Sequence, residues 1–491
     1  MSPAAICLTT IGAIVAFGTA IGFLAGVRRR MDLEQWTVGG RGFGTLLVFL
    51  LMAGEVYTTF AFLGASGWAY SRGGPALYVL TYLTLAYVVS FFFLPQLWEA
   101  GRRYGMQTES DFFAVRYGNR HLAGFVCIVG IVCFIPYLQL QITGLGIIVS
   151  VASFGGIGRV PAMSFAVVLL VAFVFAGGVR AVAWVSVVKD ALMLLAAVAI
   201  GIGIPLVHFG GIGPMFAQLA HEHPAHLTMP GATANLGHTW YVSTVLLTSL
   251  GFYMWPHAFA AAFTARSGDT LRRNALVMPI YSLTLAFIFF AGFASVLIVP
   301  GMANGDLALL TVVRQTFPPW FLGIVGGAGA LTAMVPASIF LLTAATLFAK
   351  NLFRPLCAPA MSDDQVARLA RAMVAVMGLV SLMLAVFTSS TLVSLLLTGY
   401  AGVTQFFPGV VLGLYWRRVS TTAVFTGLVV GVASAVVLMV SHHDPLFGVS
   451  AGFLALCLNF VIVIGGSLLG APSGHEREER VRAEQFASMF E

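Results

Sequence analysis

Long apolar runs separated by short polar segments make up most of the chain. Nearly all of them reach the roughly 20 residues that an α-helix needs to cross a bilayer. The runs fall near residues 4–27, 43–71, 76–97, 121–155, 160–178, 181–206, 239–264, 275–300, 319–349, 368–387, 390–415, 420–440 and 446–470. This pattern predicts about thirteen transmembrane helices in an all-α polytopic membrane protein, because a helix satisfies its own backbone hydrogen bonds within the bilayer.

The basic residues favour one orientation of these helices. With thirteen spans and the N-terminus outside, 21 of the 25 Lys and Arg residues lie in inside segments, three lie outside, and Lys189 lies within a span. The positive-inside rule describes this asymmetry, and an even number of spans would scramble it. Arg28, Arg29 and Arg30 end the first apolar run, which we therefore expect to be a helix rather than a cleaved secretory signal.

Composition agrees with a membrane protein and excludes an ordinary soluble domain. The chain is 59% hydrophobic and 9% charged, whereas soluble domains carry about 25% charged residues. The net charge of +7 comes from short loops, which fits the inside face of a membrane rather than nucleic acid. We expect one transmembrane domain over residues 1–474 and a cytoplasmic tail over 475–491, in a bacterial-type inner membrane.

The sequence favours no enzymatic reaction, metal site or cofactor. No stretch has the spacing of a nucleophile elbow, an HExxH zinc motif or a P-loop. The expected outside loop contains HEHPAH, with His221, His223 and His226, but Pro224 interrupts any helical face there. We interpret this loop as a solvated segment rather than a metal site.

Two membrane runs are interrupted in corresponding places. The second reads LLMAGEVYTTFAFLGASGWAYSRGGP, with several glycines and with Glu55 near mid-depth. The seventh contains SLGFYMWPHAFAAAF, in which Gly251, Pro256 and His257 interrupt an apolar helix. Paired interruptions of this kind indicate inverted repeats with a solute site between them. We expect the two five-helix repeats at approximately 43–206 and 239–415.

Polar and aromatic side chains near these interruptions are the candidate substrate contacts. The fourth run contains IPYLQLQITG, and its two glutamines cannot both face lipid. We expect Gln141 to line the cavity and Gln139 to bond a neighbouring helix. His257 has two interpretations, a hydrogen-bonded core histidine or a ligand for substrate or proton. The candidate substrate contacts are Tyr57, Thr58, Thr59, Gln141, Tyr253, Trp255 and His257.

The sixth run, AVAWVSVVKDALMLLAAVAIGIG, contains Lys189 and Asp190. Each charge near the bilayer centre costs roughly 3 kcal/mol, so such residues usually face a cavity or a partner. One interpretation is a structural ion pair, or a lysine that extends towards the inside face. The other is a role in coupling transport to an ion.

Four stretches together make the chain resemble the sodium/solute symporter family. They are FLGASGWAY at 62–70, RRYGMQTESDFFAVRYGNR at 102–120, GGVRAVAW at 177–184 and YAGVTQFFPGVVLGLYWRR at 400–418. The resemblance is strongest to its monocarboxylate permease branch, through GEVYTTFAFLGASGWAY, VVKDALM and MVPASIFLLTAATLFAKNLF. It implies a leucine-transporter-like fold with two inverted five-helix repeats. It also implies symport of lactate, pyruvate and similar short organic anions.

The resemblance also implies where a sodium ion would bind, and the chain departs from the family there. The sodium carbonyl positions fall at Gly54 and Tyr57, but the hydroxyl positions fall at Val335 and Pro336. Neither of these two residues offers a side-chain oxygen to a hard cation. We therefore hypothesise that Lys189 replaces the sodium ion.

This hypothesis makes Gly54, Glu55, Tyr57, Lys189 and Asp190 the candidate coupling residues, with Glu55 or Asp190 as counter-ion. A buried lysine can also release a proton, so the expected coupling ion is a proton.

Two alternatives stay open. The first is a sodium-coupled symporter of another small solute, such as an amino acid or a vitamin, with Thr343 or Thr346 supplying the hydroxyl oxygen. The second is a membrane sensor that detects a solute for a separate signalling protein.

Overall fold

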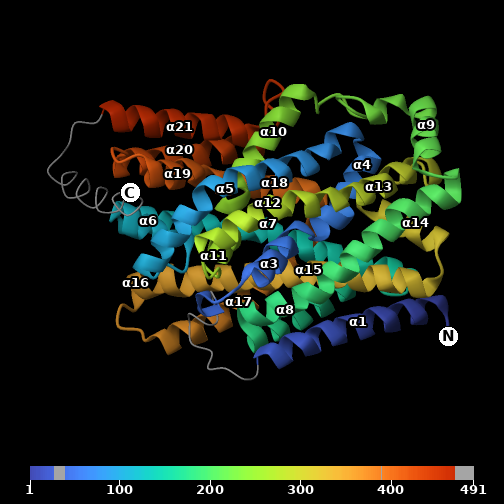
Figure 1. Cartoon of the computed structure of the whole chain (residues 1–491), viewed down its shortest axis with the longest axis horizontal. Helices are drawn as coiled ribbons and strands as arrows, with labels where there is room; N and C mark the ends of the chain where they lie inside the picture. The colour runs from blue at the N-terminus through green and yellow to red at the C-terminus, as the bar shows by residue number, and fades with distance from the viewer. Residues whose placement is uncertain (27–38, 389, 470–491) are drawn as a thin grey trace.

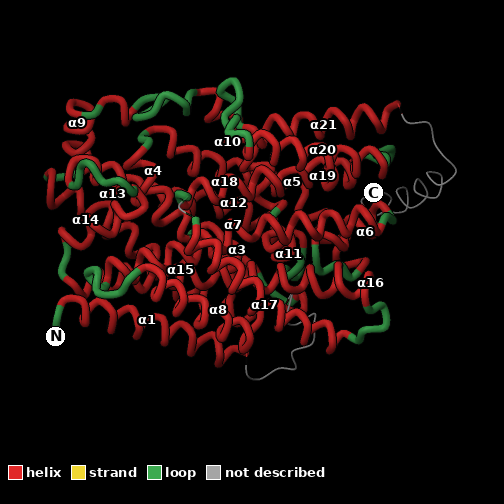
Figure 2. The backbone as a smooth tube through the Cα atoms, turned by 180° about the vertical axis from the view of Figure 1, so that it is seen from behind, coloured by secondary structure: helices red, strands yellow, loops and turns green. Residues whose placement is uncertain are grey.

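The computed structural model describes the backbone of residues 1–26, 39–388 and 390–469. Side chains are described over the same residues except 25, 26, 39, 55 and 176–181. The described chain is helical throughout and contains no β-strand (Figure 2). The expectations for Arg28, Arg29 and Arg30 and for the tail at 475–491 concern residues outside the described part. In both views α1 (Pro3–Gly26) lies along one edge, and α20 (Thr421–Val440) and α21 (Ala451–Leu469) lie along the opposite edge (Figure 1).

Between these edges, the helices follow the predicted runs. The first expected repeat contains α3 (Thr45–Val56), η2 (Phe60–Gly64), α4 (Ala65–Ser71), α5 (Tyr78–Tyr104), α6 (Glu109–Tyr117), α7 (Arg120–Ala152) and α8 (Arg159–Phe209). The second contains α10 (His238–Gly251), η5 (Phe252–Met254), α11 (Pro256–Ala262), α12 (Gly268–Ser282), η6 (Leu283–Leu285), α13 (Ala286–Ile298), η7 (Gly305–Leu307), α14 (Ala308–Thr316), α15 (Pro319–Thr346), η8 (Leu347–Phe353), α16 (Arg354–Cys357), α17 (Asp363–Phe387), α18 (Leu392–Val403), η9 (Thr404–Phe406) and α19 (Phe407–Tyr415). Ten of the described helices are long and apolar enough to cross a membrane.

Helix α8 reverses direction within its length, although it is continuous in secondary structure. A straight helix of 51 residues would separate its ends by about 75 Å. Yet the guanidinium of Arg314 lies 5.6 Å from the ring of Phe154, just before α8 begins. Two residues further along α14, the Thr316 hydroxyl bonds His208 Nε2, near the end of α8, at 2.9 Å. The apolar stretches 159–175 and 182–209 therefore run in opposite directions.

The two predicted interruptions are confirmed. Helix α3 ends at Val56, and the chain resumes helical geometry only at the π-helical turn η2. In the second repeat, η5 is followed by Trp255 in an extended conformation, and Pro256 then begins α11. Proline suits a first helical position because its missing N–H would have no partner there.

The expected outside loop has more structure than predicted. It contains the amphipathic helix α9 (Ile212–Glu222), which the sequence analysis treated as loop. His226 is anchored rather than solvated, since its Nε2 lies 3.1 Å from the carbonyl oxygen of Tyr70. A Cβ at Gly73 would lie 2.4 Å from the carbonyl oxygen of His226. The loop therefore packs on the end of α4.

Candidate functional site

The broken end of α3 meets the side chain of Lys189. Tyr57 follows the helix in an extended conformation, so nearby carbonyl groups lose their helical partners. Lys189 Nζ, from the second half of α8, donates to Gly54 O at 3.1 Å and to Tyr57 O at 3.2 Å. The ammonium group thus lies at the C-terminal end of α3, where the helix dipole is negative.

Lys189 also forms an ion pair with Asp190. Its Nζ lies 2.7 Å from Asp190 Oδ1, and the lysine side chain is 0% exposed. Consecutive residues on a helix do not normally face one another, so the long lysine side chain bends back to reach the carboxylate. Removing one partner of such a buried pair leaves an uncompensated charge, which costs roughly 3–5 kcal/mol.

Small residues let α3 and α8 approach closely at this point. A Cβ at Gly54 would lie 3.0 Å from Ser186 Oγ and 3.7 Å from Lys189 Cε. The Ser186 hydroxyl is occupied within its own helix, since it donates to Val182 O at 3.0 Å. A larger residue at position 54 would push the lysine away from the broken end.

The Tyr57 side chain contacts α12 and η6. Its ring packs edge-on against Tyr281, with ring centroids 5.2 Å apart. Its hydroxyl forms a hydrogen bond with the Thr284 hydroxyl on η6. Tyr57 therefore contributes its carbonyl group to the lysine, while its predicted substrate-binding hydroxyl already has a protein partner.

On the far side of the break, Thr59 meets Gln141 of α7. Gln141 Oε1 accepts from Thr59 N at 3.3 Å and from Thr59 Oγ1 at 2.5 Å. Gln141 Nε2 is buried and has no hydrogen-bond partner among the described residues, and the same holds for Thr58 Oγ1. Gln139 lies on the opposite face of α7, and it donates instead to the hydroxyl of Thr388, which follows α17. Both glutamines thus bond a neighbouring segment, and only Gln141 keeps a buried donor without a described partner.

Trp255 and His257 lie in an aromatic cluster beside Gln141. Tyr137, one helical turn before Gln141, packs against Trp255 with ring centroids 4.8 Å apart. Phe340 of α15 lies 4.1 Å from the Tyr137 ring and 4.4 Å from the His257 ring. These side chains are buried, so the groups on the two sides of the break at residues 57–59 are shielded from solvent.

The structure separates one predicted substrate contact from the others. Tyr253 packs against Phe93 of α5, with ring centroids 6.2 Å apart, and against Phe252 at 4.9 Å. Tyr253 lies within η5, whereas Trp255 follows it in an extended conformation. The side chain of Glu55, the other predicted counter-ion, lies outside the described residues.

The positions of the missing sodium hydroxyls lie inside α15. Val335 is buried, and Pro336 stands within the helix. Pro336 removes an N–H group that would otherwise bond the carbonyl of Thr332, and the Thr332 hydroxyl is buried without a partner among the described residues. The next hydroxyl along the helix, that of Ser338, donates to Met334 O at 2.7 Å.

Tyr137 and Phe340 are site residues that the sequence analysis missed. Tyr137 was within reach of sequence reasoning, because residues four apart share a helix face and it precedes Gln141 by four. Phe340 carried no such signal. It lies in an ordinary apolar stretch of α15, and only the packing of α15 on α7 brings it to the cluster.

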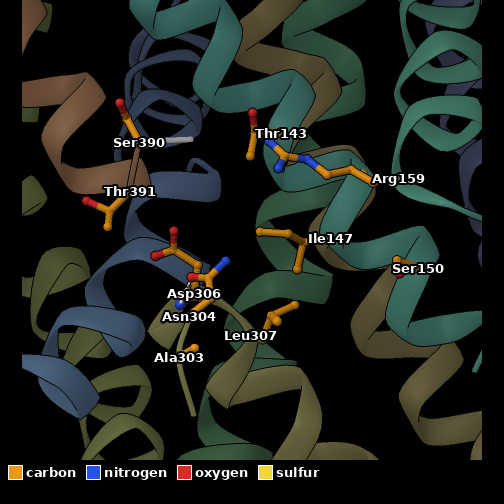
Figure 3. Close-up of a pocket in the computed structure, with 11 residues that line it drawn as sticks. Thr143, Ile147, Ser150, Arg159, Ala303, Asn304, Asp306, Leu307, Ser390 and Thr391 are labelled. Carbon is orange, nitrogen blue, oxygen red and sulfur yellow. Dashed lines mark hydrogen bonds between the residues drawn. The ribbon is translucent and has the colours of Figure 1, made fainter. Parts of the chain in front are cut away.

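A cavity of about 400 Å³ lies beyond Gln141, at the end of the molecule that holds α9 and α14. Thr143, two residues after Gln141, lines it together with the beginning of α8 and η7. Figure 3 shows Arg159 and Asp306 on different sides of this cavity. Asp306 Oδ2 accepts from the backbone N–H of Leu392 at 3.1 Å, at the first turn of α18. Polar and charged side chains therefore make up part of the lining of this cavity.

Asp306 predicts a pH dependence of stability. Burial raises the pKa of its carboxyl to about 6, against the opposing hydrogen bond from Leu392 N–H. An unfolded aspartate titrates near pH 4, so the free energy of unfolding should fall as pH rises from about 4 to about 6 and level off above. Asp306→Asn should remove this component. Thermal melting of the purified protein across this range would test it, with the exposed Asp269→Asn as control, and an unchanged slope would contradict it.

Comparison with known proteins shows the family to which the chain belongs. A model of the sodium:solute symporter family matches residues 36–431. The uncharacterized symporter YhjB of Bacillus subtilis is 42% identical over 475 residues, covering 94% of this chain and 96% of that protein. A monocarboxylate transport permease protein of Rhizobium johnstonii is 27% identical, with 91% and 93% of the two chains covered.

A solved structure has the same fold. A Na⁺-coupled sialic acid symporter, in a substrate-bound outward-open state, aligns with a TM-score of 0.79 at 17% identity. The alignment covers 95% of this chain and 98% of the other. The fold is thus that of the leucine-transporter-like proteins, as expected. The chain belongs to the sodium:solute symporter family and is a multi-pass transport protein of the plasma membrane, not an enzyme.

Proposed function

We propose that this protein imports small monocarboxylates such as lactate or pyruvate by proton symport, with Lys189 in the place of the coupling sodium ion. One observation supports this most directly. Lys189 Nζ lies 3.1 and 3.2 Å from the carbonyl oxygens of Gly54 and Tyr57, the two positions that the family resemblance assigns to sodium. The lysine therefore supplies a positive charge to carbonyls that would otherwise need a bound cation.

Electrostatics disfavours a sodium ion beside this lysine. Two unit positive charges 4 Å apart repel by about 4 kcal/mol at an effective dielectric constant near 20. A sodium ion on the same carbonyls would compete with Nζ, which lies 3.1 and 3.2 Å from them. It would also find no side-chain oxygen at Val335 or Pro336. Proton uptake and release by Lys189, or by Glu55, then provides the coupling, with Asp190 as the counter-ion of the lysine.

The groups around the break suit a short organic anion. Gln141 Nε2 and Thr58 Oγ1 are buried without partners among the described residues, and both can donate a hydrogen bond to a carboxylate. The rings of Trp255, Tyr137 and Phe340 provide an apolar wall for a short carbon chain. The name of the Rhizobium johnstonii relative agrees with a monocarboxylate substrate.

The membrane topology belongs to the same proposal. The proposed topology has thirteen crossings, in which the two stretches of α8 count separately and each broken segment counts once, with repeats at approximately 43–206 and 239–415. The N-terminal end of α1 lies at the same end of the molecule as α9 and α14, while α6 and α16 lie at the other (Figure 1). Basic residues gather at the latter end, which favours an outside N-terminus.

Purified protein in liposomes tests the coupling ion. We expect labelled lactate or pyruvate to accumulate when the outside is made acidic, and to accumulate equally with or without sodium. The pH gradient and the sodium gradient should be imposed separately, with ionophores that collapse each gradient as controls. Accumulation that requires sodium would refute the role of Lys189.

The alternative is a sodium-coupled symporter of another small solute. The family to which the chain belongs is named for sodium, and Thr343 and Thr346 provide hydroxyls further along α15. The Thr346 hydroxyl donates to Leu342 O at 2.8 Å, which leaves its oxygen able to accept a cation. Dependence of uptake on sodium, and its loss in Thr346→Val, would favour this alternative.

A further inference from the structure

Helix α6 closes the bundle at the end where basic residues gather. Its N-terminus has a capping box in which Thr108 and Asp111 bond each other's backbone N–H groups. Asp111 also accepts from Lys350 Nζ at 2.7 Å and from Asn351 Nδ2 at 2.8 Å, both on η8. These bonds hold α6 against η8, which continues from the end of α15. The helix therefore covers the side chains on its inner face.

Beneath it lies the carboxyl group of Glu109. The side chain is 0% exposed, and neither of its oxygens has a hydrogen-bond partner among the described residues. Glu109 shares a helix face with Phe112 and Phe113. Phe112 packs against Phe259 of α11 at 6.1 Å, and Phe113 packs against Phe406 of η9 at 6.3 Å. The carboxyl group therefore points into the bundle rather than towards water.

No described charge compensates for this burial. Lys350 pairs with Asp111, and Arg116 Nε donates to Gly413 O at 2.7 Å. Of the neighbouring titratable groups, the Cys133 thiol of α7 interacts with Glu109 electrostatically. Burial raises the pKa of Glu109 well above its usual range, and the carboxyl is accordingly neutral in this conformation. The titratable and charged groups on α6 and on the elements packed against it are Asp111, Arg116, Tyr117, Arg120, His121, Cys127, Cys133, Tyr137, His257, Lys350 and Tyr415.

Cys133 interacts with this carboxyl group and contacts Gly399, which lies against the proposed substrate site. A Cβ at Gly399 would lie 2.3 Å from the ring of Trp255 and 3.3 Å from the carbonyl oxygen of Cys133. Gly399 therefore contacts both Trp255 and Cys133. Helix α6, which carries Glu109, packs on α7 and on α11, the helices of Cys133 and His257.

We propose that Glu109 carries the coupling proton from the central site to the cytoplasm. While α6 stays bound to η8, the carboxyl keeps its proton. When this end of the bundle opens, water reaches the group, its O–H bond breaks, and the proton passes to water and leaves a carboxylate. The carboxylate must be reprotonated from the central site before α6 closes again, because the ionised form is too costly to bury. This inference rests on the proton coupling proposed above.

Glu109→Gln tests it, because the amide imitates the neutral carboxyl in shape and cannot release a proton. In liposomes, we expect exchange of labelled lactate across the membrane at equilibrium to stay within about twofold of wild type. Accumulation driven by a pH gradient should fall at least about tenfold. Glu99→Gln is the matched control, since Glu99 lies at the same end but pairs with Arg102 and Arg103 at the surface. Full accumulation by Glu109→Gln, with wild type driven by the pH gradient, would overturn the inference.

Infrared spectroscopy supplies a second measurement that needs no substrate. Wild type and Glu99→Gln should show the carbonyl band of a protonated carboxyl group at neutral pH, and Glu109→Gln should lack it. Absence of this band from wild type would overturn the inference about Glu109. A wild type that has the band but shows no accumulation under a pH gradient would instead overturn the proposed proton coupling.

Discussion

Lys189→Met is expected to abolish gradient-driven uptake, with a loss of at least about a hundredfold, because breaking a buried ion pair costs roughly 3–5 kcal/mol. The substitution keeps the length of the side chain and removes its charge. It leaves the carbonyl groups of Gly54 and Tyr57 without their donor and strands the Asp190 carboxylate. Initial rates of lactate uptake into liposomes under a pH gradient would measure the effect.

A second variant separates coupling from folding. Lys189→Met combined with Asp190→Asn removes the stranded carboxylate and should recover stability, measured as the melting temperature in detergent. It should not recover driven uptake, because the two carbonyl groups still lack a positive charge. Normal uptake by Lys189→Met would refute the proposed role of the lysine. Uptake regained by the double variant would make Lys189 and Asp190 a structural pair only.

Gln141→Glu is expected to raise the KM for a monocarboxylate at least about tenfold, through loss of a hydrogen bond to a charged group worth about 1.5–3 kcal/mol and through added repulsion. The glutamate can still accept from the N–H and hydroxyl of Thr59, so the contact between α7 and the broken segment should persist. What it loses is the Nε2 donor, which has no described protein partner. Concentration dependence of lactate uptake would measure KM.

The matched control is the glutamine two residues earlier. Gln139 lies on the opposite face of α7 and donates to the Thr388 hydroxyl, so Gln139→Glu adds the same charge away from the proposed anion site. We expect it to change KM much less than Gln141→Glu does. Equal effects of the two variants would show that charge in the helix, rather than a lost contact, is responsible.

Much of the fold follows from local patterns in the sequence. Apolar runs mark the membrane helices, because a segment can cross the lipid only if about 20 consecutive residues are predominantly apolar. This property can be read from the sequence of the segment alone. The break near Trp255 follows from Pro256, which acts on the backbone where it stands, whereas α3 continues through Gly54 and ends only at Val56. A charge such as Lys189 within an apolar run also indicates a cavity or a charged partner. The free-energy cost of placing a charge in the bilayer is high whichever partner the fold supplies, so the position alone carries this signal.

The partners themselves were decided by tertiary packing. Lys189 reaches Gly54 across 135 positions of sequence, and Thr59 reaches Gln141 across 82. Local patterns carry no information about such distances. The family resemblance was needed to place the lysine at the broken helix, and it left Asp190 and Glu55 equally eligible as counter-ion. The structure assigns the described ion pair to Asp190, because the lysine side chain bends back to this neighbouring carboxylate.

The same limit explains the residues that were misjudged or missed. Tyr253 precedes Trp255 by two residues, yet it packs against Phe93 rather than in the aromatic cluster. Phe340 joins that cluster from an apolar stretch without any distinguishing signal. The sequence by itself therefore determined which segments cross the membrane, where two of them break, and that a buried lysine needs an explanation. Which side chains meet at the breaks was decided only by the tertiary structure, because the packing of helices distant in sequence sets the direction of each side chain.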